Sequence, residues 1–111
     1  MKITLCGSAK FEKSFHDWNE KLTFAGHVVY SLAVYPSSKE RNKNWYTEEQ
    51  KTLFDLVHFA KIEESDAVVV LNVDGYVGDS TRREITWAQI REKQVLYLET
   101  DHAPTSVDIL L

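Results

Sequence analysis

Hydrophobic positions along the chain follow two kinds of spacing, which alternate from one end to the other. Short runs of apolar and β-branched residues predict four strands, at residues 3–6, 27–34, 67–71 and 95–98. Apolar residues that return every three or four positions predict three helices between them, at residues 11–25, 47–65 and 81–92. Gly26 stands where a helix C-cap glycine belongs, and Thr47 with Gln50 fits a capping box that opens the second helix.

This order of elements predicts a single α/β domain over residues 1–111. Strands that alternate with helices favour a doubly wound parallel sheet of four to five strands in a three-layer sandwich, of the flavodoxin-like or Rossmann-like kind. Ligands of such sheets bind beyond the carboxyl ends of the strands, at a topological switch point. In this chain the rule selects Gly7-Ser8 after the first strand and residues 72–80 after the third.

Composition and charge indicate which kinds of binding partner the chain can have. Hydrophobic residues make up 43% of the 111 residues, which is enough for a core. Lys and Arg number 13 against 17 Asp and Glu, for a net charge of −4, and an acidic domain lacks the positive charge that nucleic-acid polymers and anionic membranes require. No apolar run approaches the roughly 20 residues of a membrane span. We therefore expect a small-molecule partner.

Cysteine and histidine usage bears on compartment and cofactors. Cys6 is the only cysteine, and the apolar run at the start of the chain is too short for a signal peptide, so we expect a cytoplasmic protein. The four histidines show no metal-ligand spacing and one thiol is not a cluster, so we expect no metal site. The glycine patterns that bind nucleotide phosphates in P-loops and dinucleotide-binding folds are absent, and no cofactor is expected.

The segment after the third predicted strand carries the strongest candidate chemistry. It turns through Gly75 and Gly78 and enters a helix with Ser80 and Thr81 at its start and Glu84 one turn inside. A carboxylate at this place can attack an electrophilic sugar carbon while the hydroxyls fix the substrate. The same Thr81-x-x-Glu84 spacing also fits a capping box, in which Glu84 only satisfies a backbone N–H. Spacing alone leaves both open.

Two further elements have a chemical and a plain interpretation. The backbone N–H groups at Gly7-Ser8 can bind a phosphate or a sugar hydroxyl, although an ordinary strand-to-helix turn has the same sequence. Arg82 and Arg83 fit either phosphate ligands or a solvated helix face.

Residues 62–97 resemble the nucleoside 2-deoxyribosyltransferase family, which includes the deoxynucleoside 5′-monophosphate N-glycosidases. The resemblance rests on the glycine-ended first strand at Gly7-Ser8, on Ser65-Asp66 before the third strand, and on the Ser80-Thr81-x-x-Glu84 helix start. It implies that Glu84 is the nucleophile and that a glycosyl-enzyme ester forms, as in retaining glycosidases.

The resemblance also implies where to look for the acid that protonates the departing base. The family's aspartate eight residues before Asp66 is His58 in this chain, and Asp55 lies one helical turn earlier. A second family aspartate, six residues before the glutamate, is replaced by Gly78, with Asp79 beside it.

Three functions from different classes follow from these observations. The first is cleavage or transfer of the N-glycosidic bond of a (deoxy)nucleoside or its 5′-monophosphate, through a glutamate nucleophile. The second is a non-catalytic nucleotide-binding or sensing module on the same scaffold. The third is a phosphoribohydrolase of the lysine-decarboxylase-like class, against which the missing PGGxGT run counts.

The predicted site and assembly complete these expectations. The expected catalytic residues are Glu84, His58 and Asp55, and the expected substrate-binding residues are Gly7, Ser8, Asn72, Gly78, Asp79, Ser80 and Thr81. We also expect a homodimer, because the resembling family builds its sites at subunit contacts. The apolar positions of the second and third helices, with Trp45, Tyr46 and Trp87 nearby, exceed what one thin layer needs.

Overall fold

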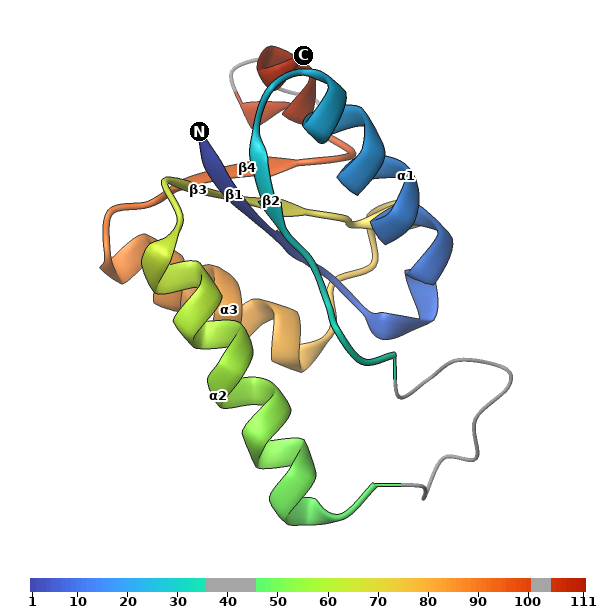
Figure 1. Cartoon of the computed structure of the whole chain (residues 1–111), viewed down its shortest axis with the longest axis vertical. Coiled ribbons are helices and arrows are strands. Elements are labelled where there is room, and N and C mark those ends of the chain that lie inside the picture. Colours follow the sequence, from blue (N-terminus) through green and yellow to red (C-terminus); the bar gives the residue numbers. More distant parts are fainter. Residues whose placement is uncertain (36–45, 101–104) are drawn as a thin grey trace.

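A parallel sheet forms the centre of the molecule. The computed structural model describes residues 1–35, 46–100 and 105–111 (Figure 1). The four strands are β1 (Lys2–Cys6), β2 (Val28–Tyr30), β3 (Ala67–Val70) and β4 (Gln94–Tyr97). They pair in the order β2-β1-β3-β4, and all three pairings are parallel. The expected doubly wound α/β architecture is confirmed, with its switch point between β1 and β3.

Helices cover both faces of this sheet. Helix α1 (Glu12–Phe24) and the short C-terminal helix η4 (Val107–Leu110) lie on one face, while α2 (Glu48–Glu64) and α3 (Asp79–Ile90) lie on the other (Figure 1). Two single-turn helices, η1 (Ala9–Phe11) and η2 (Val73–Gly75), follow β1 and β3 directly. The three layers leave the carboxyl ends of β1 and β3 next to the starts of α1 and α3.

Side-chain alternation along β1 divides the core between the two faces. Ile3 and Leu5 pack with Phe15 and Trp18 of α1, whereas Cys6 packs with Ile62 on the α2 side. This alternation follows from the period of two in a strand. Cys6 is therefore a buried residue that faces the helix α2.

The Ser65-Asp66 pair ties β1 to the start of β3. A carboxylate oxygen of Asp66 accepts a hydrogen bond of 2.8 Å from the backbone N–H of Lys2, and the hydroxyls of Thr4 and Ser65 lie 2.5 Å apart. These contacts lie toward the amino ends of the strands. The pair therefore has a structural role, on the side of the sheet remote from the predicted ligand edge.

The second predicted strand is shorter than expected. Residues 27–34 form a strand only over Val28–Tyr30, because the pairing with β1 ends at Thr4 and Tyr30. The chain then leaves the sheet, and Leu32 and Val34 line a cavity instead. Apolar character correctly indicated partial burial here, since Leu32 packs against the core cluster of Ile3 and Leu5 as well as lining the cavity.

The start of α3 decides between the two interpretations of the Thr81-x-x-Glu84 spacing. The helix begins at Asp79 with Gly78 as its N-cap, so Thr81 lies inside the first turn and the capping-box alternative is wrong. The capping box of the preceding helix is confirmed, since Thr47 and Gln50 exchange both hydrogen bonds. Glu84 therefore does not take part in capping helix α3.

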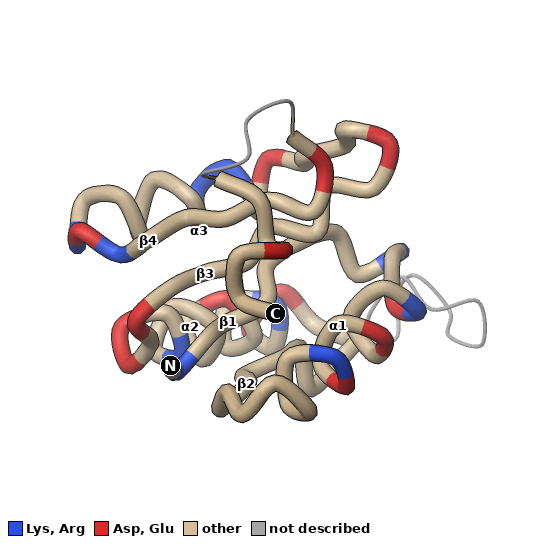
Figure 2. The backbone as a smooth tube through the Cα atoms, turned by 90° about the horizontal axis from the view of Figure 1, so that it is seen from above, with Lys and Arg blue, Asp and Glu red and all other residues tan. Residues whose placement is uncertain are grey.

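Charged residues of both signs are interspersed along the described backbone (Figure 2). This distribution accords with the balance of 13 Lys and Arg against 17 Asp and Glu in the sequence. Within the described ranges, no helix combines the length and the apolar character that a membrane crossing needs.

Candidate active site

A cavity of about 310 Å³ lies at the carboxyl ends of β1 and β3. Its walls come from the loops after these two strands, the first turns of α3, the middle of α2 and the segment that follows β2. Nine of the ten site residues predicted from the sequence line it: Gly7, Ser8, Asp55, His58, Gly78, Asp79, Ser80, Thr81 and Glu84. The cavity therefore lies at the topological switch point, where the strand order alone predicts a ligand site.

Glu84 is the most perturbed acid of this cavity. The residue is 9% exposed, and its Oε2 atom has no hydrogen-bond partner among the described residues. Burial, helped by the negative charge of Asp55, raises the pKa of Glu84 to about 8, although Lys51 and Arg83 act in the opposite direction. The carboxyl group is therefore protonated at neutral pH.

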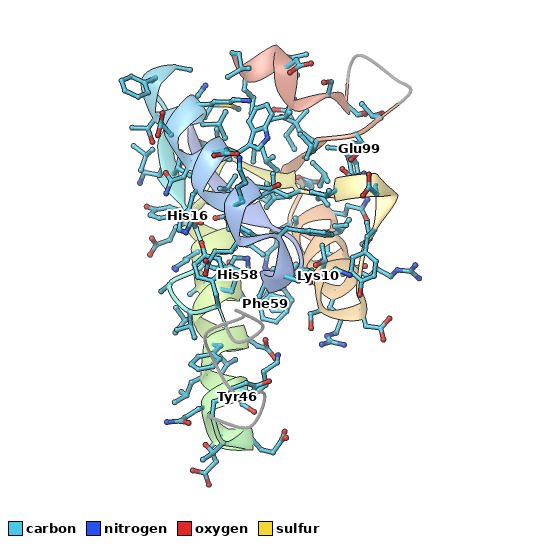
Figure 3. The ribbon with its side chains drawn as sticks, turned by 90° about the vertical axis from the view of Figure 1, so that its right-hand side faces the viewer. Lys10, His16, Tyr46, His58, Phe59 and Glu99 are labelled. Atoms are coloured by element: carbon cyan, nitrogen blue, oxygen red, sulfur yellow. The ribbon has the colours of Figure 1, made fainter. Side chains whose placement is uncertain are left out.

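His58 projects from α2 toward the same carboxyl group. Its Nε2 atom lies 3.5 Å from Oε1 of Glu84 and 3.6 Å from Sγ of Cys6. Burial, with a smaller contribution from Lys61, lowers the pKa of His58 to about 4. In Figure 3, His58 lies close to Phe59, and Tyr46 lies well away from both toward the other end of α2. At neutral pH the His58–Glu84 pair carries no net charge.

Asp55 lies one turn before His58 on α2 and also lines the cavity. Its carboxylate accepts a hydrogen bond of 2.7 Å from Nζ of Lys51, and both side chains are more than one-third exposed. Asp55 and His58 both line the cavity that Glu84 lines. Asp55 therefore lies in the more solvent-exposed part of the cavity wall, and His58 lies in the more buried part.

The start of α3 offers an anion-binding edge to the cavity. No described side chain caps this helix, so the positive end of its dipole faces the space lined by Asp79, Ser80 and Thr81. The guanidinium of Arg83 donates a hydrogen bond of 3.2 Å to the hydroxyl of Ser80. A positive charge and a hydroxyl thus lie together at the helix start.

Gly7 allows the first loop to approach β3 closely. A Cβ atom at this position would lie 3.2 Å from the carbonyl oxygen of Leu71 and 3.3 Å from its Cβ. The next residue, Ser8, accepts a hydrogen bond of 3.4 Å from the N–H of Lys10 and so caps η1. The loop is held against the sheet by packing that only glycine permits without a shift.

Asn72 is the one predicted site residue that does not line the cavity. Its side-chain amide donates to the carbonyl of Glu99 and accepts from the N–H of Glu99, both at 2.9 Å. Figure 3 shows Glu99 at a distance from His58. The expected substrate contact is therefore replaced by a link between the ends of β3 and β4, because both polar ends of the amide are already used.

Sequence reasoning missed most of the apolar wall. Phe54 and Phe59 of α2 and Tyr76 of the third-strand loop line the cavity with Leu32 and Val34. Trp87, one of the aromatic residues counted toward a subunit contact, packs on Phe59 with ring centroids 4.9 Å apart. The helical spacing of Phe54 and Phe59 was visible, but spacing does not say which face of a helix covers a core and which a cavity. Trp45 lies outside the described residues.

The structure also brings together three potential metal ligands. Sγ of Cys6, Nε2 of His58 and a carboxylate oxygen of Glu84 lie within 4.8 Å of one another, and all three residues are buried. They come from β1, α2 and α3, so no local ligand spacing marks them in the sequence. The expectation of no metal site rested on that spacing and does not account for this cluster.

No family model matches the chain, and no curated protein matches it in sequence. Solved structures do match. A CMP N-glycosidase of Clostridium botulinum superimposes with a TM-score of 0.57 at 21% identity, over 87% of this chain and 70% of that one. A 2-deoxyribosyltransferase of Bacillus psychrosaccharolyticus gives 0.64 at 19% identity, over 87% and 71%. A conserved protein of Enterococcus faecalis V583 gives 0.61 at 18% identity, over 97% and 69%.

The chain has the nucleoside 2-deoxyribosyltransferase-like fold. This confirms the resemblance inferred from Gly7-Ser8, Ser65-Asp66 and the helix start at Ser80. At such identities the likeness shows the fold alone, and the chemistry depends on the residues of this chain.

Proposed function

We propose that the chain cleaves or transfers the N-glycosidic bond of a (deoxy)nucleoside or its 5′-monophosphate, with Glu84 as the nucleophile. One observation carries this proposal. The Glu84 carboxyl group lines a cavity at the carboxyl ends of β1 and β3, is nine-tenths buried, and has an oxygen without a described partner. A structural carboxylate at such a place would be paired, whereas a nucleophile needs an oxygen free to attack.

The neighbouring imidazole of His58 accepts and donates the proton that the reaction moves. Glu84 passes its proton to Nε2 of His58, and the carboxylate attacks C1′ of the sugar. The C1′–O bond forms as the C1′–N bond breaks, and the departing base takes the proton from His58. Asp55, on the same wall, is the second candidate donor. Water or a second base then opens the glycosyl ester, which gives hydrolysis or transfer.

The remaining walls fit the other parts of such a substrate. Ser8, Ser80 and Arg83, with the start of α3, suit a 5′-phosphate or the sugar hydroxyls. Phe54 and Phe59 offer aromatic surface on which a base can stack. The substrate-binding assignments of Gly7, Gly78, Asp79 and Thr81 belong to the same proposal, while Asn72 is left out of it.

Release of free base tests this function directly. The pure protein is incubated with deoxynucleosides, ribonucleosides and their 5′-monophosphates, with and without a second base. Liberated base without an acceptor indicates hydrolysis, and a new nucleoside indicates transfer. Mass spectrometry of the denatured protein should detect a glycosyl adduct on the peptide that contains Glu84. Absence of base release and of exchange with every substrate would overturn the proposal.

The alternative, a non-catalytic nucleotide-binding module, is favoured by one observation. Glu84 carries its proton at neutral pH, and a protonated carboxyl group is a poor nucleophile unless His58 removes that proton. Such a module would bind a nucleotide in calorimetry and release no base at any pH at which the fold is stable.

We also propose that the chain forms a homodimer. Leu53, Leu56 and Val57 of α2 are each more than half exposed, and this helix contributes Lys51, Phe54 and Asp55 to the cavity wall. A homodimer would bury this face, which lies on the side of α2 opposite the residues that line the cavity.

A further inference from the structure

We propose that Cys6, His58 and Glu84 bind a divalent transition-metal ion of the zinc class. The binding itself depends only on the geometry of these three side chains. Its effect on catalysis rests on the proposed function, because one of the three ligands is the proposed nucleophile. Cys6 ends β1, His58 lies in the middle of α2 and Glu84 lies in α3, so the fold and not the local sequence assembles the set.

The distances between the donor atoms match those around a tetrahedral zinc ion. With metal–sulfur bonds near 2.3 Å and metal–nitrogen bonds near 2.0–2.1 Å, a tetrahedral angle separates sulfur from nitrogen by about 3.6 Å and nitrogen from oxygen by about 3.4 Å. The observed separations are 3.6 Å from Sγ of Cys6 to Nε2 of His58, and 3.5 Å from Nε2 to Oε1 of Glu84. The third pair lies within 4.8 Å, which a small rotation of the carboxylate shortens.

The donor types select the metal. A thiolate, an imidazole and a carboxylate together suit zinc and its neighbours in the first transition row, whereas calcium and magnesium prefer oxygen ligands alone. Three protein ligands leave a fourth position open, and it would face the cavity that His58 and Glu84 line.

A buried carboxylate oxygen without a described partner supports an ion at this place. Oε2 of Glu84 forms no hydrogen bond within the described residues, and His58, whose Nε2 faces the same carboxyl group, is 6% exposed. A neutral imidazole protonated at Nδ1 presents the lone pair of Nε2 to the other two donors. Unsatisfied buried polar atoms are uncommon, and an ion that binds between these donors would use the carboxylate that the apo arrangement leaves half paired.

Metal binding and nucleophilic attack compete for the same carboxylate. Binding releases the thiol proton of Cys6 and the carboxyl proton of Glu84 to solvent and places the carboxylate in the metal's coordination sphere. The carboxylate is then not available to attack C1′, and the imidazole lone pair is not available to move a proton. A zinc-class ion is therefore a reversible inhibitor of the proposed reaction.

Cobalt(II) serves as the spectroscopic probe of the site. Addition of Co²⁺ to the metal-free protein should produce tetrahedral ligand-field bands and a thiolate-to-cobalt charge-transfer band, both displaced by Zn²⁺. Cys6→Ser should remove the charge-transfer band. Glu84→Gln should weaken zinc binding by on the order of 100-fold, since loss of even an outer partner of a metal ligand costs 10–100-fold. His16→Gln, at an exposed histidine of α1, is the matched control and should bind the metal as the wild type does.

Each result of this experiment decides the matter. A charge-transfer band that depends on Cys6 supports the site, and the Glu84→Gln titration confirms it even if Cys6→Ser folds poorly. Octahedral cobalt without thiolate absorption, or equal affinity in Glu84→Gln, overturns the metal site. Inhibition of base release by zinc and its reversal by a chelator then test the link to catalysis. Absence of base release from the metal-free protein would overturn the proposed function and leave the cobalt result standing.

Discussion

Nε2 of His58 lies 3.5 Å from Oε1 of Glu84, across the contact between helices α2 and α3. Burial shifts the two pKa values in opposite directions, to about 4 for His58 and about 8 for Glu84, because it disfavours the charged form of each group. The pair therefore holds one proton over a wide range around neutrality. Movement of that proton from Glu84 to His58 creates a nucleophile and an acid in one step.

Glu84→Gln should abolish base release and leave the fold intact. Glutamine keeps the shape of the side chain, and Glu84 does not cap α3, so the melting temperature at neutral pH should not fall. Base release is measured with the substrate that the wild type cleaves best. Wild-type turnover by Glu84→Gln would show that another group attacks the sugar.

The pH dependence of kcat/KM in the presence of a chelator should be bell-shaped. The active form carries one proton on the pair, so the rate should rise through about pH 4 and fall through about pH 8. The falling limb appears because the proton needed by the departing base is lost. A rate that continues to climb above the pKa of Glu84 would instead assign the acid to a group other than His58.

Two variants should move the alkaline limb in opposite directions. The negative charge of Asp55 raises the pKa of Glu84 and the positive charge of Lys51 lowers it. Asp55→Asn should therefore shift the limb to lower pH, and Lys51→Met should shift it to higher pH. The position of the limb is compared and not the height of the profile, because Asp55 is also a candidate acid. If the alkaline limb lies at the same pH in both variants as in the wild type, its assignment to Glu84 is wrong.

Stability should decline on both sides of a middle pH range. The raised pKa of Glu84 means that the unfolded chain loses its proton above about 4.5 while the folded chain keeps it to about 8, so the free energy of unfolding falls as pH rises through this range. The lowered pKa of His58 gives the reverse, a loss as pH falls from about 6.5 to about 4. Denaturant unfolding of Glu84→Gln should flatten the alkaline decline, and that of His58→Gln the acidic decline. Unchanged curves in both variants would contradict the burial of the pair.

The fold could be predicted from the sequence because its signals are local and repeated. The alternation of strands and helices fixed the class, and the switch-point rule named the loops at Gly7-Ser8 and at Ser80. The period of two along β1 likewise puts Cys6 on the opposite face of the sheet from Ile3 and Leu5. Each of these inferences needs only the neighbours of a residue along the chain.

The chemistry of the site could not be predicted in the same way. Whether Thr81 caps α3 depends on where the helix begins, and the N-cap is Gly78, three residues earlier. The contact of Cys6 with His58 depends on how α2 crosses the sheet, which no local spacing encodes. Asn72 has the same polar groups as a substrate ligand, and only the position of Glu99 shows that they are already satisfied.

Gly7→Ala should destabilise the protein and disturb the cavity. The added Cβ would lie 3.2 Å from the carbonyl oxygen of Leu71, so the loop or β3 must shift, and overpacking of this kind costs roughly 1–3 kcal/mol. Denaturant unfolding measures the loss. Gly26→Ala, where no atom lies within 4 Å of the added Cβ, separates steric crowding from the backbone cost of replacing a glycine at positive φ. If Gly7→Ala has the same denaturant midpoint of unfolding as the wild type, the loop is not tightly packed.

The face of α2 that carries Leu53 and Leu56 should bind a second copy of the chain. These side chains are 57% and 58% exposed, and such a stripe on a helix that also walls a cavity is costly to leave in water. The cavity of about 310 Å³ is at the lower end of the range for small-molecule sites, roughly 300–1,000 Å³, and α2 forms one of its walls. Sedimentation at micromolar concentration should show a dimer, and the double variant Leu53→Ser/Leu56→Ser should sediment as a monomer with reduced base release. Phe24→Ser, at an 86% exposed position at the end of α1, is the matched control and should remain dimeric. A wild-type monomer that cleaves its substrate would show that one chain closes the site alone.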